Sequence, residues 1–72
     1  MKKVSIIVPT YNEEESLPHF YKEMCKVIDS LSNKYDFEML FINDGSKDNT
    51  LNILDQLRKK DPRVNYIDMS RN

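Results

Sequence analysis

The sequence has very little glycine, cysteine or histidine, and these shortages exclude several kinds of site. Its 72 residues include one glycine, one cysteine, one histidine, and neither tryptophan nor alanine. The glycine-rich dinucleotide fingerprint and the P-loop each need at least two glycines, so neither is present. A structural zinc site needs four cysteine or histidine ligands, and the chain has too few of both. The single Cys25 cannot form an internal disulfide, which is typical of an intracellular protein.

The chain also lacks an excess of charge and a long apolar run. Its 11 lysines and arginines nearly balance its 12 aspartates and glutamates. A nucleic-acid-binding protein usually shows a basic stripe, so we expect no nucleic-acid partner. No apolar run approaches the roughly 20 residues that span a membrane. Only five residues, 4–8, stand between the basic start of the chain and Pro9, which is too few for the apolar core of a signal peptide.

The length limits how much core the chain can build. A domain of this size buries only about 60% of the surface that its unfolded chain exposes. Without a disulfide or a structural metal, such a core gives little net stability. We therefore expect a marginal small domain, an oligomer, or a piece of a longer protein.

Three short apolar runs predict β-strands at residues 4–8, 37–42 and 64–69. The first run is mostly β-branched and almost wholly apolar, which is typical of a strand buried on both faces.

Two helices are predicted between these strands. Apolar residues recur at spacings of three and four from Leu17 onward, which predicts an amphipathic helix that ends near Asn33. Capping by Ser16 places Pro18 in the first turn, where its missing N–H does no harm.

The second helix is predicted to follow the turn at residues 43–46, with Ser46 as its cap, and to end before Pro62. Asp48, Asp55 and Asp61 are expected to lie on its solvated surface.

The order β-α-β-α-β predicts an α/β fold with a parallel three-stranded sheet and right-handed crossovers. Ligands of such sheets bind beyond the carboxyl ends of the strands. Three polar segments follow the three strands, at residues 9–13, 43–46 and 70–72. We therefore expect these segments to converge on one edge and form a site.

Asp44 and Tyr11 are the most informative residues of these segments. The Asp44 carboxylate follows a strand directly and can accept hydrogen bonds from a base or a sugar, or it can simply organise the turn. Gly45 permits a positive φ after it. Tyr11 can stack on a nucleobase or pack on a neighbouring loop.

Charged residues in the same segments have two interpretations each. The run Glu13-Glu14-Glu15 can supply a ligand carboxylate, or it can be a solvated run before a helix N-terminus. Arg71 can pair with a phosphate, or it can be disordered near the chain end.

The ordered motifs resemble one family over the whole chain. Residues 8–15, Val-Pro-Thr-Tyr-Asn-Glu-Glu-Glu, followed by Leu17-Pro18, resemble the opening of family-two inverting glycosyltransferases of the GT-A fold. Residues 41–50, Phe-Ile-Asn-Asp-Gly-Ser-Lys-Asp-Asn-Thr, are similar to the family's D-D-G-S-x-D-x-T motif, with Asn43 as a variant known in one subgroup. Residues 70–72 resemble a third element. The subgroup is that of polyprenyl-phosphate sugar transferases, of the dolichol-phosphate mannosyltransferase and bactoprenol glucosyltransferase type.

The resemblance implies a site for a nucleotide-diphosphate sugar, whose sugar would pass to an acceptor, expected to be a polyprenyl (lipid) phosphate. The implied binding residues are Pro9, Tyr11, Asn12, Glu13, Asp44, Gly45, Ser46 and Arg71.

The same resemblance implies that residues 1–72 are part of a larger GT-A domain, the N-terminal half of a Rossmann-like unit. In the family, Mg or Mn is held by an Asp-x-Asp motif after the next strand, and the catalytic base lies further on. We therefore expect this stretch to contain no catalytic residue, to bind no metal by itself and to be inactive alone. The full-length protein is expected to be membrane-associated, on the cytoplasmic side.

The implied strand order is third-second-first, which leaves the first strand at an edge. An exposed apolar edge invites pairing with another chain, so we expect self-association through residues 4–8.

Two other functions are compatible with this topology. One is a nucleotide-binding module without catalysis, which would bind through Tyr11 and Asp44. The other is a receiver-like signalling domain. A receiver needs an acidic pair after the first strand and an aspartate after the third. This chain has Pro9-Thr10 and Ser70-Arg71 at these places, so its residues argue against a receiver.

Overall fold

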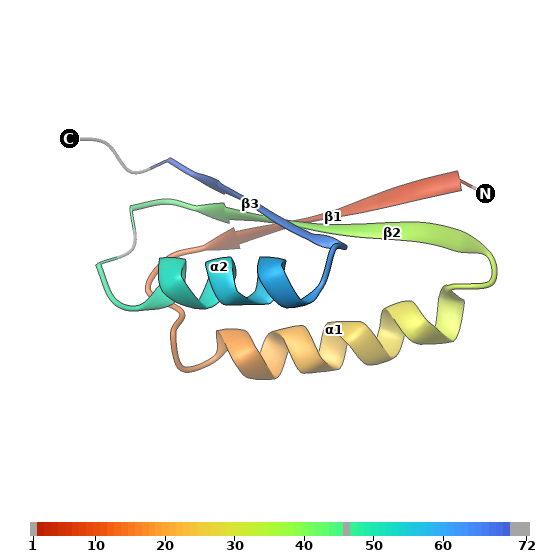
Figure 1. The fold of residues 1–72 in the computed structure, drawn as a ribbon, viewed down its shortest axis with the longest axis horizontal. Helices are drawn as coiled ribbons and strands as arrows, with labels where there is room; N and C mark the ends of the chain where they lie inside the picture. The colour runs from red at the N-terminus through yellow and green to blue at the C-terminus, as the bar shows by residue number, and fades with distance from the viewer. Residues whose placement is uncertain (1, 46, 70–72) are drawn as a thin grey trace.

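The computed structural model describes residues 2–45 and 47–69. Strands and helices alternate along the chain, as the sequence predicts (Figure 1). The elements are β1 (Lys2–Thr10), α1 (Leu17–Leu31), β2 (Tyr35–Asn43), α2 (Thr50–Lys60) and β3 (Val64–Asp68).

The three strands form one parallel sheet in the order β1-β2-β3, which is the predicted order read from the opposite edge. Both helices lie on the same face of this sheet, and all three strands run toward the same end of the molecule (Figure 1). The α/β prediction is therefore confirmed.

The core lies between the sheet and the two helices. From the sheet, Met39, Phe41 and Val64 are fully buried. These residues share one sheet face because Met39 lies beside Val64 in the register and Phe41 follows two positions later. The helices supply the remaining buried apolar residues, which are Leu17, Ile28, Leu54 and Leu57.

The opposite sheet face is open over the part of the chain that the structure describes. Ile7 on β1 and Ile67 on β3 are 57% and 48% exposed. The prediction that the first strand is buried on both faces is therefore wrong for Ile7. The cause is topological. Each new strand is added on the same side of the previous one, and right-handed crossovers then place both helices on the same face of the sheet.

The first helix begins at Leu17 as predicted, but Ser16 does not cap it with its side chain. Its hydroxyl instead donates a hydrogen bond to Glu13 Oε2 at 2.7 Å. The helix ends at Leu31, two residues before the predicted Asn33, since Ser32 takes the C-cap position.

The second helix begins at Thr50, later than predicted, and residues 47–49 precede it. The cause is Asp48, whose Oδ1 accepts a hydrogen bond from the Thr50 backbone N–H at 3.0 Å and so forms a turn ahead of the helix. The predicted cap, Ser46, lies outside the described residues.

Asp61 is 7% exposed, so its assignment to the solvated surface is wrong. It accepts hydrogen bonds from the Tyr21 hydroxyl at 2.7 Å and from Arg63 Nη2 at 2.9 Å. The Arg63 hydrogen bonds lower the pKa of Asp61 to about 2, against the effect of its burial and with help from the Tyr21 hydroxyl. The cluster of Tyr21, Asp61 and Arg63 thereby joins α1 to the turn that precedes β3.

Candidate functional site

The carboxyl ends of β1 and β2 meet at one edge of the sheet. Thr10 lies beside Asn43 in the register, and its hydroxyl donates to the Ile42 carbonyl at 3.0 Å. The Asp44 backbone N–H continues the pairing by donating to the Thr10 carbonyl at 3.1 Å. The polar segments after these two strands are therefore neighbours, as predicted.

The end of β3 reaches the same edge. The Met69 backbone N–H donates to the Asn43 carbonyl at 2.8 Å, which fixes the last described residue of the chain beside β2. The third predicted polar segment, residues 70–72 with Arg71, lies outside the described residues, as does Ser46.

Asp44 is exposed at the turn that follows β2. Gly45 has a φ of 72°, the positive value that the sequence predicts there. A Cβ at position 45 would meet no atom within 4 Å, so glycine is favoured there by the positive φ and not by lack of space. The chain thus turns directly after Asp44 and leaves its carboxylate on the surface.

The segment after β1 presents Tyr11, whose side chain is 54% exposed. The next residue, Asn12, has a φ of 51°, an uncommon value that asparagine tolerates. Its Oδ1 accepts a hydrogen bond from the Lys47 backbone N–H at 2.7 Å. Asn12 therefore joins the segment after β1 to the segment after β2.

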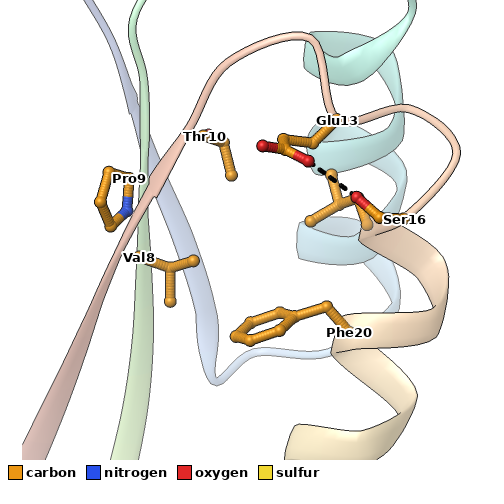
Figure 2. Close-up of a pocket in the computed structure, with 7 residues that line it drawn as sticks. Val8, Pro9, Thr10, Glu13, Ser16 and Phe20 are labelled. Atoms are coloured by element: carbon orange, nitrogen blue, oxygen red, sulfur yellow. Dashed lines mark hydrogen bonds between the residues drawn. The ribbon is translucent and has the colours of Figure 1, made fainter.

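A cavity of about 260 Å³ lies between the end of β1 and the start of α1 (Figure 2). Val8 and Phe20 face each other across it, and the hydrogen-bonded pair Glu13 and Ser16 lies at one end. Pro9 also contributes to its lining. An apolar wall with a few polar groups is a common arrangement for binding a small molecule.

Two residues that hold the site together were missed by sequence reasoning. Thr50 is fully buried, and its Oγ1 accepts a hydrogen bond from the Glu13 backbone N–H at 2.8 Å. Asp48 was expected to be solvated, but its Oδ2 accepts a hydrogen bond from the Glu14 backbone N–H at 3.2 Å. The available signal was the spacing Asp-x-Thr ahead of a helix, in which the aspartate accepts from the backbone two residues on.

The pKa of Asp48 is lowered. Desolvation acts in the opposite direction, but hydrogen bonds from the Thr50 hydroxyl and from the Thr50 and Glu14 backbone N–H groups outweigh it. Asp48 is therefore held as a carboxylate that accepts hydrogen bonds.

Asn43 stands where the D-D-G-S motif usually has its first aspartate. It is fully buried, and its Nδ2 donates to Asp68 Oδ1 at 3.3 Å. A carboxylate at position 43 would face a second carboxylate at this distance, and such pairs repel each other. The amide of Asn43 is thus compatible with Asp68 on the neighbouring strand.

Within residues 2–45 and 47–69, no group of three histidine, cysteine, aspartate or glutamate side chains is placed to hold a metal ion. The described residues therefore do not fit the Mg or Mn site that the resemblance implies for the whole enzyme. No helix in these ranges has the length and apolar character needed to cross a membrane.

The structure is a parallel α/β unit, and its candidate site is formed by the polar loops at the carboxyl ends of the strands. Residues 5–72 match the model of the family "Glycosyl transferase family 2", and the chain belongs to this family. The observed sheet is accordingly the N-terminal half of a Rossmann-like GT-A domain.

Several curated proteins are similar over nearly the whole chain. It is 47% identical over 68 residues to an uncharacterized glycosyltransferase of Bacillus subtilis, a match that covers 94% of this chain and 20% of that protein. It is 44% identical over 70 residues to a prophage bactoprenol glucosyl transferase homolog of Escherichia coli, with 97% of this chain and 22% of that protein covered. The bactoprenol glucosyl transferase of Shigella phage SfX has the same identity and coverage. The chain spans about a fifth of the length of these relatives.

Proposed function

We propose that residues 1–72 bind the nucleoside end of a nucleotide-diphosphate sugar in an enzyme that transfers the sugar to a polyprenyl phosphate. Membership of glycosyl transferase family 2 supports the transfer reaction. The lipid acceptor is supported by the names of two relatives, which are bactoprenol glucosyl transferases or their homologs.

The observation that carries this proposal is the backbone contact between Asp44 and Thr10. The 3.1 Å hydrogen bond fixes the turn bearing the Asp44 carboxylate beside the residue that precedes Tyr11. Both Asp44 and Tyr11 are exposed, so a ligand can reach them. An aromatic ring for stacking and a carboxylate for hydrogen bonding are the groups that a nucleoside needs.

The negative charge at the carboxyl ends of β1 and β2 indicates which part of the nucleotide-diphosphate sugar lies there. Asp44 and Glu13 accept hydrogen bonds, which suits the N–H groups of a base and the hydroxyl groups of a ribose. The same carboxylates repel a diphosphate. In this proposal Pro9, Tyr11, Asn12, Glu13, Asp44 and Gly45 surround the nucleoside. Ser46 and Arg71, which the resemblance assigns to the same nucleotide site, lie outside the described residues.

Other parts of the reaction are proposed to depend on residues beyond position 72. These include the metal-binding Asp-x-Asp motif, the catalytic base and the segments that attach the protein to the cytoplasmic face of a membrane. Residues 1–72 alone are then a partial domain without transferase activity.

The proposal is tested by calorimetric titration of the full-length protein with uridine and guanosine diphosphates, followed by a transfer assay with the matching sugar donors. We expect one nucleotide to bind with a micromolar Kd and its sugar to be transferred to polyprenyl phosphate. Binding without transfer would identify a non-catalytic module, and binding of neither nucleotide would contradict the proposal.

We also propose that residues 1–72, produced alone, self-associate through β1. This strand forms an edge of the described sheet, and Ile7 on it is 57% exposed. Unpaired edge groups next to apolar side chains favour strand pairing between chains. We expect sedimentation velocity to show species larger than a monomer that decrease in Ile7→Lys, since an edge lysine opposes pairing. A single monomeric species at high concentration would contradict this prediction.

A further inference from the structure

The loop between β1 and α1 is held in place by the segment ahead of α2. Four hydrogen bonds connect the two, although the residues are 34 to 37 positions apart in the chain. Two of them run from the backbone N–H groups of Glu13 and Glu14 to side chains at positions 50 and 48. The third runs from the Lys47 backbone N–H to Asn12 Oδ1, and the fourth from the Asn49 backbone N–H to Glu14 Oε1 at 3.5 Å.

Thr50 is the centre of this network. Its hydroxyl accepts from the Glu13 N–H at 2.8 Å and donates to Asp48 Oδ1 at 2.5 Å. Because a hydroxyl has a single proton, donation to Asp48 fixes its orientation and leaves its lone pairs directed at other donors. Thr50 is fully buried, so water does not compete for these bonds.

Asp48 uses its two oxygens for two different tasks. Oδ1 binds the Thr50 backbone N–H at 3.0 Å and so serves the first turn of α2. Oδ2 binds the Glu14 backbone N–H at 3.2 Å, across the gap between the two loops. The turn ahead of α2 needs only the first of these contacts, so the second is available to hold residues 12–14.

We propose that Asp48 and Thr50 are positioning residues that hold residues 12–14 in the conformation that receives the nucleoside. The inference rests on the proposed function, since it concerns the same site. Tyr11 precedes residues 12–14 and Glu13 lies within them, so neither needs to be ordered by the ligand if this segment is already fixed. A site ordered in advance binds more tightly because less conformational entropy is lost on binding.

The test compares Thr50→Val with Thr50→Ser in the full-length protein. Valine keeps the shape of threonine but cannot bind Glu13 or Asp48, whereas serine keeps the hydroxyl. We expect Thr50→Val to speed hydrogen exchange in residues 11–15 by about tenfold and to raise the donor KM by about tenfold, with kcat changed less than threefold. These values follow from the loss of one or two buried hydrogen bonds. Thr50→Ser is expected to restore both readouts to within about threefold of the wild type.

Tyr21→Phe is the matched control, because it also removes one hydroxyl–carboxylate hydrogen bond, at 2.7 Å, but in the cluster with Asp61. It is expected to lower the Tm without changing the donor KM or the exchange of residues 11–15. Asp48→Asn gives a second variant should Thr50→Val fail to fold, and it is expected to raise the donor KM in the same direction.

The possible outcomes separate this inference from the proposed function. Unchanged exchange in Thr50→Val, or faster exchange with an unchanged donor KM, would overturn the positioning role while leaving nucleotide binding intact. A wild-type protein that binds no nucleotide at all would overturn the proposed function and this inference together.

Discussion

Replacing Asp44 with asparagine in the full-length protein is expected to weaken nucleoside diphosphate binding by about 30-fold. Asparagine keeps the size of the side chain but loses the charge and one acceptor oxygen. Hydrogen bonds to charged groups contribute about 1.5–3 kcal/mol each, and 2 kcal/mol corresponds to roughly 30-fold in Kd. The measurement is calorimetric titration of wild type and variant with the nucleotide that the wild type binds. The Tm is expected to change little because Asp44 is exposed.

Asp36→Asn is the control for this prediction. Asp36 is also an exposed carboxylate on β2, near the start of the strand and away from the site. It experiences the same change of charge, so it reports any effect of net charge on nucleotide binding. Equal Kd values for the wild type and Asp44→Asn would contradict the assigned role of Asp44.

Replacing Asp61 with alanine is expected to lower the free energy of unfolding by about 2 kcal/mol without changing nucleotide affinity. The substitution leaves the Tyr21 hydroxyl and the Arg63 guanidinium without their shared partner. Since the Arg63 side chain is 33% exposed, water compensates part of the loss. Urea unfolding of wild type and variant gives the difference. Asp29→Asn is the control, because Asp29 contacts the same arginine at 3.4 Å but is 72% exposed, and it is expected to have almost no effect.

The same aspartate predicts a dependence of stability on pH. The pKa of Asp61 falls from 3.8 in the unfolded chain to about 2 in the folded one, which corresponds to about 2 kcal/mol. Because the folded pKa is the lower one, this stability is present above about pH 4 and is lost as the pH falls toward 2. Between about pH 4 and pH 2, the free energy of unfolding of Asp61→Ala is expected to fall by about 2 kcal/mol less than that of the wild type. Parallel pH profiles for the two proteins would contradict the assignment.

Much of the fold was predictable because the apolar spacing is regular. The recurrence of apolar residues from Leu17 onward predicted α1, and the place of Pro18 in its first turn gave its start. The short apolar runs located all three strands. The start of α2 was not predictable in this way, because the Asp48 carboxylate competes with the helix for the Thr50 backbone N–H. This competition depends on tertiary contacts, since the Glu14 backbone N–H binds the same carboxylate from 34 residues away.

The candidate site was predictable to a similar degree. Parallel topology alone predicted that the residues after β1 and β2 lie at the same end of the sheet. The hydrogen bond from the Asp44 backbone N–H to the Thr10 carbonyl confirms that these residues are neighbours. Burial was harder to predict. Asp61 looked like a surface residue because one of its partners, Tyr21, lies 40 positions away on α1, and no spacing in the sequence reveals such a contact.

The central claim is that a nucleotide binds at the edge formed by the ends of β1 and β2. Hydrogen exchange of the full-length protein, with and without a saturating nucleoside diphosphate, tests this most directly. The account predicts slower exchange in residues 9–14 and 43–45 and unchanged exchange in residues 58–63, which lie at the other end of β3. Protection confined to other parts of the protein, with residues 9–14 and 43–45 unaffected, would contradict it.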